Sequence, residues 1–419
     1  MASDGEYVEL GTCLEMVIDH RGKTPKKLGA DWVERGVPTI SAKNVNGGRL
    51  VAEDAIRYVS HEVYKRWMKD DVKRGDCFLV SEGATLGECM LWDEDYPVVL
   101  GQRIFCLRAN PTVLYPRYLY SYMTSANFQS EIIARATGTS VDGLRQTEVL
   151  KMKIKLLPME HQRQIGDTLY FLNTKIELNR RMNETLEGLA RAIFQSWFVD
   201  FDPVRAQRDG LPPPARSPAT AALFPDSFED SELGKIPKGW RTIRWGEIAT
   251  LEYGKSLRDY QAGVGRYVVF GTNGRIGRHD DALCNSEGII IGRKGAYRGV
   301  HFSPEPFFVI DTAFYLKPKA DLDLKWAYFE LLNFDINNMD SGSAIPSTSR
   351  DDFYSIPVNV PPVEIQRCFG RIVTALFAKK FGNERESVRL AAIRDALLPK
   401  LLSGEIRVAD AERLVEDSV

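Results

Sequence analysis

The feature that most constrains this chain is an internal repeat that covers most of its length. Segment 158–166 aligns with segment 362–370, 204 residues further on, and shares its proline, glutamate, glutamine, arginine and glycine. Upstream, the offset drifts to 212 residues, where Gly83 aligns with Gly295. Two copies of one unit predict a duplicated architecture, and the changing offset indicates loops of different length on a shared scaffold.

Each copy begins with short stretches rich in valine, isoleucine, phenylalanine and tyrosine, interrupted by glycine and asparagine, which is typical of strands. We expect helices at 116–134 and 323–338 and a last strand in each copy at 151–157 and 355–360. A long helix then follows in each copy, opened by Pro158 or Pro362, because the fixed φ of proline suits the first helical turn. Between the copies, residues 209–234 are rich in proline, serine and alanine, which is typical of a linker.

The two long helices carry matching seams. Apolar and asparagine positions between 165 and 197 alternate in steps of four and three, which is typical of a coiled coil, and the second helix repeats the pattern 204 residues later. If the helices pair antiparallel, Asn179 meets Ser387 and Asn183 meets Asn383. Polar layers then face polar layers and fix the register, whereas an asparagine facing an apolar seam would be costly. The alternative is two amphipathic helices that pack separately, each onto its own domain.

The composition excludes several classes of protein. The chain has 419 residues, of which 44% are hydrophobic and 27% charged, as in soluble globular proteins. No run approaches the roughly 20 apolar residues that cross a bilayer, and the first ten residues do not resemble a signal peptide, so we expect a cytosolic protein. The six cysteines form no CxxC pair and the five histidines do not cluster with them, which predicts neither a disulfide framework nor a structural metal.

Motifs of a stand-alone enzyme are absent from the sequence. No Walker A loop, GxGxxG fingerprint or HExxH pair occurs, and the segments 202–204 and 359–363 miss the Asn/Asp-Pro-Pro-aromatic loop of an amino-methyltransferase. Asp226, Glu232 and Lys235 resemble a nuclease carboxylate set, but the spacing from glutamate to lysine is one residue too long. The sequence therefore favours a binding protein.

Basic and amide side chains crowd the irregular segments of both copies. Arginine and lysine bind guanine edges or phosphates, and asparagine binds adenine. In the first copy the candidates are Arg21, Lys23, Lys26, Lys27, Lys43, Asn44, Asn46 and Arg49. In the second copy they are Lys255, Arg258, Asn273, Arg275, Arg278, Arg293, Lys294 and Arg298. Each residue alone is more readily a solvated surface residue, but their recurrence in two repeats with unlike loops favours two readers of different DNA sequences.

Two small-residue loops add further candidates for DNA contact. Segments 138–140 and 342–344 each begin with glycine and a hydroxyl residue, and Arg145 and Arg350 follow them. The alternative is a simple turn between helix and strand. Because the formal net charge is −2, any DNA-binding face must be a local basic patch.

Several segments together resemble the specificity subunit of type I restriction-modification systems. They are 197–203, 223–228 and 234–240, together with the duplicated Pro-x-Glu-x-Gln-Arg helix openings. The resemblance covers nearly the whole chain and rests on the combination of these pieces. It implies an α+β fold with two tandem target recognition domains, each followed by a long helix, and the two helices form an antiparallel coiled coil.

The resemblance also implies the function and the partners. Each recognition domain would read one half of a bipartite, asymmetric site in double-stranded DNA, while the helices set the gap and dock two methyltransferase subunits. A nuclease-translocase subunit is a further partner, and the chain has no membrane partner. S-adenosylmethionine and ATP would belong to the partner subunits, and this chain would bind no cofactor and carry no catalytic residue.

The expected organisation follows from the repeat and the resemblance. It comprises a first recognition domain at 1–157, a central helix at 158–202, a linker at 203–236, a second recognition domain at 237–360, a C-terminal helix at 361–403 and a tail at 404–419. A different hypothesis is a protein-protein scaffold with two pseudo-symmetric partner sites that touches DNA only incidentally. A third hypothesis, an enzyme active by itself, has no motif to support it.

Overall fold

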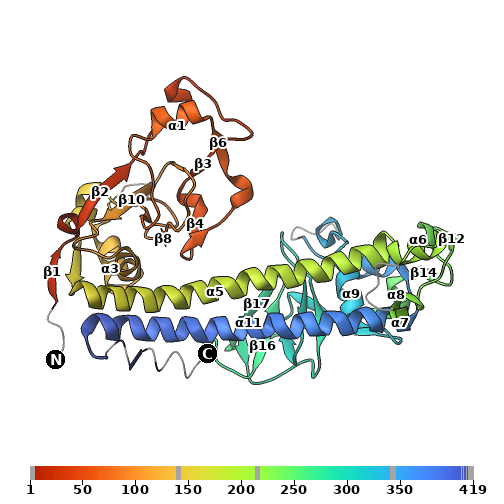
Figure 1. Cartoon of the computed structure of the whole chain (residues 1–419). Helices are drawn as coiled ribbons and strands as arrows, with labels where there is room; N and C mark the ends of the chain where they lie inside the picture. The colour runs from red at the N-terminus through yellow and green to blue at the C-terminus, as the bar shows by residue number, and fades with distance from the viewer. Residues whose placement is uncertain are drawn as a thin grey trace. The chain divides into compact units, whose positions relative to one another are not determined.

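The structure, a computed structural model, describes residues 5–137, 143–212, 218–339 and 346–406, together with residues 408, 410, 411 and 413. The chain divides into two compact units (Figure 1). Unit 1 comprises Met1–Arg180 and Glu384–Val419, and unit 2 comprises Arg181–Asn383. Among the helices of the described ranges, none combines the length and the apolar character needed to cross a membrane.

Unit 1 is built on a four-stranded antiparallel sheet. Its strand order is β2 (Leu14–Asp19), β10 (Ile104–Ala109), β7 (Cys77–Val80) and β8 (Cys89–Leu91). A three-stranded sheet has the order β6 (Arg57–Val59), β3 (Val37–Ile40) and β9 (Val99–Leu100), in which β3 and β9 are parallel. Two ribbons complete the strands, namely β1 (Glu6–Glu9) with β11 (Lys153–Leu156) and β4 (Val45–Asn46) with β5 (Arg49–Leu50).

The central sheet of unit 1 is covered on both faces, because successive side chains of a strand point to opposite sides. In β10, Phe105 and Leu107 join a core with the helices, whereas Ile104 and Cys106 join a core with the three-stranded sheet. The helices are α1 (His61–Trp67), α2 (Pro116–Met123), α3 (Ala126–Arg135) and α4 (Gln146–Lys151). Short 3-10 turns are η1 (Leu10–Cys13), η2 (Lys26–Leu28), η3 (Ala42–Asn44) and η4 (Glu53–Ala55).

Unit 2 repeats this topology. Its four-stranded sheet has the order β15 (Ala249–Tyr253), β21 (Ala313–Pro318), β18 (Gly288–Gly292) and β19 (Val300–Ser303). Its three-stranded sheet has the order β17 (Gly274–His279), β16 (Tyr267–Gly271) and β20 (Phe307–Val309), again with one parallel pair. The ribbon of β14 (Arg241–Arg244) with β22 (Pro357–Val360) corresponds to that of β1 with β11. The predicted duplication is therefore present in both sheets and in this ribbon, whereas, among the described residues, the β4–β5 ribbon belongs to unit 1 alone.

The helical elements of unit 2 follow the same plan. They are α8 (Trp245–Ile248), α9 (Leu324–Leu331) and α10 (Arg350–Ser355), with short turns η6 (Tyr260–Ala262) and η7 (Ile336–Asn338). Successive side chains of the central sheet enter different cores, as in unit 1. Ile289 and Ile291 of β18 face the helical core, whereas Ile290 joins the core of the three-stranded sheet. Additional elements precede β14, namely α6 (Asp202–Arg208), α7 (Pro218–Ala221), β12 (Phe228–Ser231) and β13 (Gly234–Pro237).

The long helices are α5 (Met159–Phe194), which continues as a π-helical segment η5 (Gln195–Val199), and α11 (Val363–Ser403). In unit 1, α5 contributes Ile165 and Leu169 to the same core as Leu397 and Leu401 of α11. In unit 2, Phe194 of α5 shares a core with α11, and its ring centre lies 5.7 Å from that of Phe369. The helices therefore contact each other in both units, which contradicts the alternative that they pack separately.

The repeated motif at the start of each long helix joins the helix to its domain. The buried Gln162 accepts a hydrogen bond from Tyr115 N at 2.9 Å and donates to Val113 O and Leu157 O at 3.0 and 2.8 Å. Four residues later, a Cβ on Gly166 would lie 2.6 Å from a backbone nitrogen of α2, so only glycine allows the close approach of the two helices.

The motif makes equivalent bonds in unit 2. The buried Gln366 accepts from Asp323 N at 3.1 Å and donates to Pro361 O at 2.9 Å. A Cβ on Gly370 would lie 2.1 Å from an oxygen of the Asp323 carboxylate. The duplicated glutamine and glycine thus have a packing explanation in both copies.

Three expectations about the elements need correction. The helix expected at 116–134 is interrupted, because the Ser125 side chain caps a new helix by accepting from Phe128 N. The expected linker is ordered in its described part, since Val204, Phe224 and Ile236 are buried in the unit 2 core. The composition did not predict this order, because the segment is rich in proline and only a few of its apolar residues hold it in the core. Residues of the expected tail also pack, because Val408 and Ala411 are buried in unit 1.

Candidate nucleic-acid interface

The predicted polar layers lie between the two long helices. In unit 1, the buried Asn179 donates through Nδ2 to Glu386 Oε2 at 2.7 Å and to Ser387 Oγ at 3.4 Å. In unit 2, the buried Asn383 donates through Nδ2 to Asn183 Oδ1 at 2.8 Å. The structure thus brings together the four register residues in the expected pairs.

Ion pairs flank these layers. Lys175 Nζ lies 3.5 Å from Glu386 Oε1 in unit 1, and Lys380 Nζ lies 2.8 Å from Glu187 Oε2 in unit 2. Lys380 and a neighbouring arginine lower the pKa of the Glu187 carboxyl below its usual value, against the effect of burial. The polar middle of the helix pair therefore has charged as well as amide partners.

Most basic candidates of unit 1 are exposed. Lys26, Lys27, Lys43, Asn46, Arg49 and Arg145 lie on its surface. Arg21 is held more firmly, because its guanidinium pairs with Asp19 at 2.8 Å and donates to Leu144 O at 3.3 Å. Its guanidinium carbon lies 4.3 Å from the centre of the Phe105 ring. Arg21 therefore presents a fixed and partly neutralised cation.

Asn44 does not belong to the surface. It is fully buried, its Oδ1 accepts from Ser41 N and Oγ at 3.1 and 3.0 Å, and its Nδ2 donates to Val51 O and Ala52 O at 3.3 Å. All of its hydrogen-bonding groups hold the turn around η3. The expectation that Asn44 contacts DNA is wrong, because a buried and fully bonded amide cannot reach a base.

The basic candidates of unit 2 divide in the same way. Lys255, Arg258, Asn273, Arg275, Arg278 and Lys294 are exposed. Arg278 is tied to its sheet, since it donates to Gly265 O and Arg266 O at 2.7 and 2.6 Å. Arg298 is buried and donates to Asn337 O at 2.8 Å, so it connects the β18–β19 hairpin to η7. The expectation that Arg298 contacts DNA is therefore wrong.

Two candidates converge on one aromatic ring in unit 2. The guanidinium carbons of Arg293, after β18, and Arg350, at the start of α10, both lie 4.7 Å from the ring centre of Tyr253. Tyr253 is 46% exposed, so this cluster is open to solvent. Tyr253 was not a candidate from the sequence, because a tyrosine that ends a strand carries no distinctive signal.

The same end of the sheet in unit 1 carries an arginine on an aromatic ring. Tyr253 pairs with Phe314 in unit 2, and Asp19 pairs with Phe105 in unit 1. Arg293 lies over Phe314 as Arg21 lies over Phe105, with guanidinium carbons 5.7 and 4.3 Å from the ring centres. Each unit thus holds a stacked guanidinium at the end of its central sheet. The loops 138–140 and 342–344 lie outside the described residues.

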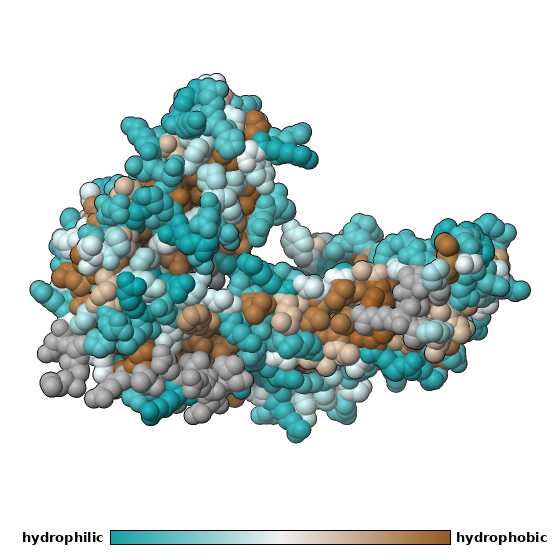
Figure 2. All heavy atoms as spheres, in the orientation of Figure 1, coloured by the Kyte–Doolittle hydropathy of each residue, from teal (hydrophilic) through white to brown (hydrophobic). Residues whose placement is uncertain are grey.

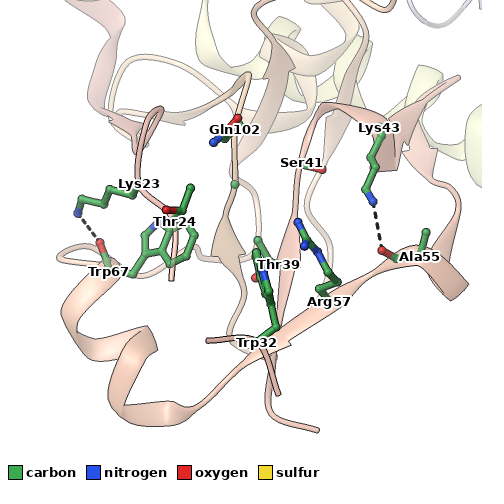
Figure 3. A pocket seen from close by; sticks show the side chains of 11 residues that line it. Lys23, Thr24, Trp32, Thr39, Ser41, Lys43, Ala55, Arg57, Trp67 and Gln102 are labelled. Atoms are coloured by element: carbon green, nitrogen blue, oxygen red, sulfur yellow. Dashed lines mark hydrogen bonds between the residues drawn. The ribbon is translucent and has the colours of Figure 1, made fainter. Parts of the chain in front are cut away.

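A separate pocket of about 310 Å³ opens in unit 1 (Figure 3). It contains two residues that were DNA candidates, Lys23 and Lys43, and others that were not. Its side-chain walls include Thr24, Trp32, Thr39, Ser41, Arg57, Trp67 and Gln102. The pocket was not predicted, because Trp32, Arg57 and Trp67 come from separate segments of the chain and belong to no recognisable motif.

The described part of the chain contains no metal-binding cluster of histidine, cysteine and acidic side chains. In the nuclease-like set, Glu232 pairs with Arg244 at 3.1 Å and Lys235 with Asp230 at 3.1 Å, so these groups do not converge. Burial raises the pKa of the Cys89 thiol to about 12, which keeps it protonated at neutral pH.

Comparison with known proteins identifies a family with the same duplicated domain. Residues 3–188 and 237–388 match the family described as type I restriction modification DNA specificity domain, and the chain belongs to this family. It is 22% identical to the type I restriction enzyme MjaIX specificity subunit of Methanocaldococcus jannaschii, over 93% of this chain and 91% of that protein. It is 23% identical to the HindI specificity subunit of Haemophilus influenzae, over 81% and 88% of the two chains.

A solved structure shows the same fold. The crystal structure of a type I restriction-modification system S subunit from M. genitalium covers 95% of this chain and 96% of its own, with a TM-score of 0.65 and 19% identity. At that identity the likeness concerns the fold alone. The two matched family segments lie on either side of residues 189–236 and coincide with the two copies of the repeat.

Proposed function

We propose that this chain is the non-catalytic DNA sequence-specificity subunit of a type I restriction-modification complex. Each unit carries one recognition domain that reads one half of a bipartite, asymmetric site. The observation that carries the proposal is the duplication itself, in which two domains of one topology differ in their loops yet join the long helices through the same glutamine and glycine. Such an arrangement suits two readers of unlike sequences.

The stacked arginines support the reading role. A guanidinium held over a ring keeps its planar donors in a fixed orientation, which suits bidentate bonds to guanine or to phosphate. Arg293 and Arg350 in unit 2 have this geometry, and Arg21 in unit 1 is stacked in the same way while its guanidinium is already paired with Asp19. Exposed cations around them, such as Arg145 and Lys294, would supply phosphate contacts that position the duplex.

The long helices would dock two methyltransferase subunits and set the gap between the half-sites as a coiled coil. Phe171 and Leu178, seven residues apart on one face of α5 in unit 1, are 64% and 52% exposed. In unit 2, a hollow of about 350 Å³ lies between α5 and the end of α9, with Phe194 and Phe329 in its walls. Figure 2 shows apolar side chains along this helical part of unit 2. Apolar surface with polar neighbours marks protein interfaces.

The partners would supply the chemistry. Methyl transfer needs S-adenosylmethionine and translocation needs ATP, and we assign both to the methyltransferase and to a nuclease-translocase subunit. The purified chain is then expected to bind duplex DNA without modifying it. If scrambled duplexes compete as well as the methylated motif does, the scaffold hypothesis replaces the reading function.

A helix insertion tests the ruler function. Seven residues added at matched points, after Arg181 in α5 and after Arg385 in α11, keep every seam residue on its own face. They lengthen each helix by about 10.5 Å, or about three base pairs of DNA. Long-read sequencing of methylated bases in a host carrying this chain and its methyltransferase should show a wider gap with unchanged half-sites. The same insertion after Gly210, in an exposed turn, should leave the gap unchanged.

A domain exchange tests the reading function. Replacing residues 5–157 by the corresponding domain of another family member should change one half-site and leave the other intact. A change in both half-sites, or methylation that no longer depends on sequence, would contradict the proposal.

A further inference from the structure

The pocket in unit 1 has a strongly one-sided charge. Lys23, Lys43 and Arg57 line it, and none of its described lining residues is acidic. Lys23 donates to Trp67 O at 2.6 Å and Lys43 to Ala55 O at 3.3 Å, so each ammonium keeps further protons to donate (Figure 3). Burial and the nearby charge of Lys69 lower the pKa of Lys23.

Arg57 lines the same pocket and its guanidinium is held in a fixed orientation. Its guanidinium carbon lies 3.9 Å from the ring centre of Trp32, and it makes no hydrogen bond or ion pair with any residue that the structure describes. Trp32 in turn packs against Trp67, with ring centres 6.5 Å apart. The stacking therefore orients the guanidinium and leaves all of its N–H donors available to a ligand.

Two buried groups in the pocket have no partner. Thr39 is 8% exposed and Trp67 is 1% exposed, yet neither Thr39 Oγ1 nor Trp67 Nε1 has a hydrogen-bond partner in the described chain. Leaving such a group unpaired is costly, so native proteins usually pair it. A ligand that accepts hydrogen bonds would satisfy both groups.

The hydrogen-bonding groups of the pocket all suit one kind of ligand. The indole and the cations can only donate, and the hydroxyls of Thr24 and Thr39 can donate as well. A cluster of donors with positive charge and without an acid is suited to a tetrahedral oxyanion with several acceptor oxygens. The volume of about 310 Å³ lies near the lower end of small-ligand sites, roughly 300–1,000 Å³, and admits a phosphate with part of its ester group.

We propose that this pocket is a phosphate-binding site in which Arg57, Lys43 and Lys23 hold the anion and Thr39 and Trp67 complete its hydrogen bonds. The phosphate has two sources, the backbone of the bound duplex or the phosphate of a free nucleotide. The first source rests on the proposed function, because it requires the chain to bind DNA. The second does not, since a nucleotide would bind the chain alone.

The variants are chosen to leave the fold intact. Arg57→Gln and Lys43→Gln remove exposed charges, and Thr39→Val removes one hydroxyl at nearly constant volume. Lys65→Gln is the matched control, because Lys65 is exposed on α1 and does not line the pocket. Thermal unfolding of each full-length variant verifies that the domain is folded before binding is measured.

One arm titrates the full chain, without DNA, with inorganic phosphate and with deoxyadenosine monophosphate by calorimetry. If the source is a free nucleotide, the wild-type chain and Lys65→Gln bind, while Arg57→Gln and Thr39→Val bind about tenfold more weakly, as expected when a charged or buried hydrogen bond is lost. Duplex affinity then stays unchanged in every variant.

The other arm measures duplex affinity against salt concentration. If the source is the DNA backbone, Arg57→Gln and Lys43→Gln weaken binding equally for all sequences and reduce the slope of log K against log salt by about 0.9 per lost contact. Lys65→Gln keeps the wild-type slope. If the pocket variants match the wild type in both arms, the phosphate site is refuted. If the wild-type chain binds no duplex at all, the proposed function fails, and the first arm alone decides about the pocket.

Discussion

The glutamine at the start of each long helix offers a quantitative test of how the helices hold their domains. Gln162 makes three hydrogen bonds with backbone groups and Gln366 makes two. At about 1 kcal/mol for each buried bond, Gln162→Leu should lower the free energy of unfolding by about 3 kcal/mol and Gln366→Leu by about 2 kcal/mol. Leucine is of similar size, so the change isolates the loss of the polar partners.

Hydrogen exchange locates the effect in each unit. The amide of Tyr115 donates to Gln162, and the amide of Asp323 donates to Gln366. In Gln162→Leu the peptide containing Tyr115 should exchange faster while the one containing Asp323 keeps its wild-type rate, and Gln366→Leu should show the reverse. Urea unfolding gives the overall cost of each variant.

Two results would refute this reasoning. One is a smaller loss of stability for Gln162→Leu than for Gln366→Leu. The other is protection of the Tyr115 amide that stays at the wild-type level in Gln162→Leu, which would mean that the bond contributes nothing to the closed state. As a further comparison, Gln162→Glu keeps the acceptor for Tyr115 N but places a buried carboxyl against the two carbonyl oxygens, so it should cost more than Gln162→Leu.

Further predictions concern buried charge and glycine. Burial raises the pKa of the Glu330 carboxyl from 4.5 to about 7. The stabilising contribution of the protonated carboxyl is therefore complete below pH 4.5 and is lost as the pH rises through 7. Glu330→Gln should raise Tm at pH 8 and leave it unchanged at pH 4.5. Arg108 forms a buried bidentate pair with Asp76, and Arg108→Met should cost about 3–5 kcal/mol in urea unfolding, with partial recovery when Asp76→Leu is added. Gly188→Ala meets no atom within 4 Å and should stabilise by about 0.5–1 kcal/mol, whereas Gly166→Ala meets backbone and should destabilise; equal Tm shifts would contradict this.

Sequence periodicity predicted the architecture correctly because a periodic pattern extends over many residues. The heptad-like seam and the constant offset of 204 residues placed Asn179 opposite Ser387 and Asn183 opposite Asn383, since one register satisfies every layer of a long helix pair together. The strand order was not accessible in the same way. It depends on pairings between distant segments, such as β3 with β9, that no local pattern encodes.

Single side chains were harder to place than elements. Asn44 and Arg298 have the composition of a DNA contact, but tertiary packing turned both inward, where they bond to backbone oxygens. Arg57 and Trp32 form one unit in space from separate segments of the chain, and neither residue is unusual alone. Residue type therefore indicated which chemistry was available, and only the fold decided which groups reach solvent together.

The discontinuous make-up of unit 1 has a consequence for how the protein is made. Residues 5–180 leave the ribosome before unit 2, and the end of α11 that completes their core arrives only afterwards. At about 5–20 residues per second, the roughly 200 intervening residues take about 10–40 s to synthesise. During that interval Leu169 and Leu172 lack the partners that Leu390 and Leu397 later provide. Unit 2 is contiguous and can close first, so the domain at the start of this sequence is the last to be finished.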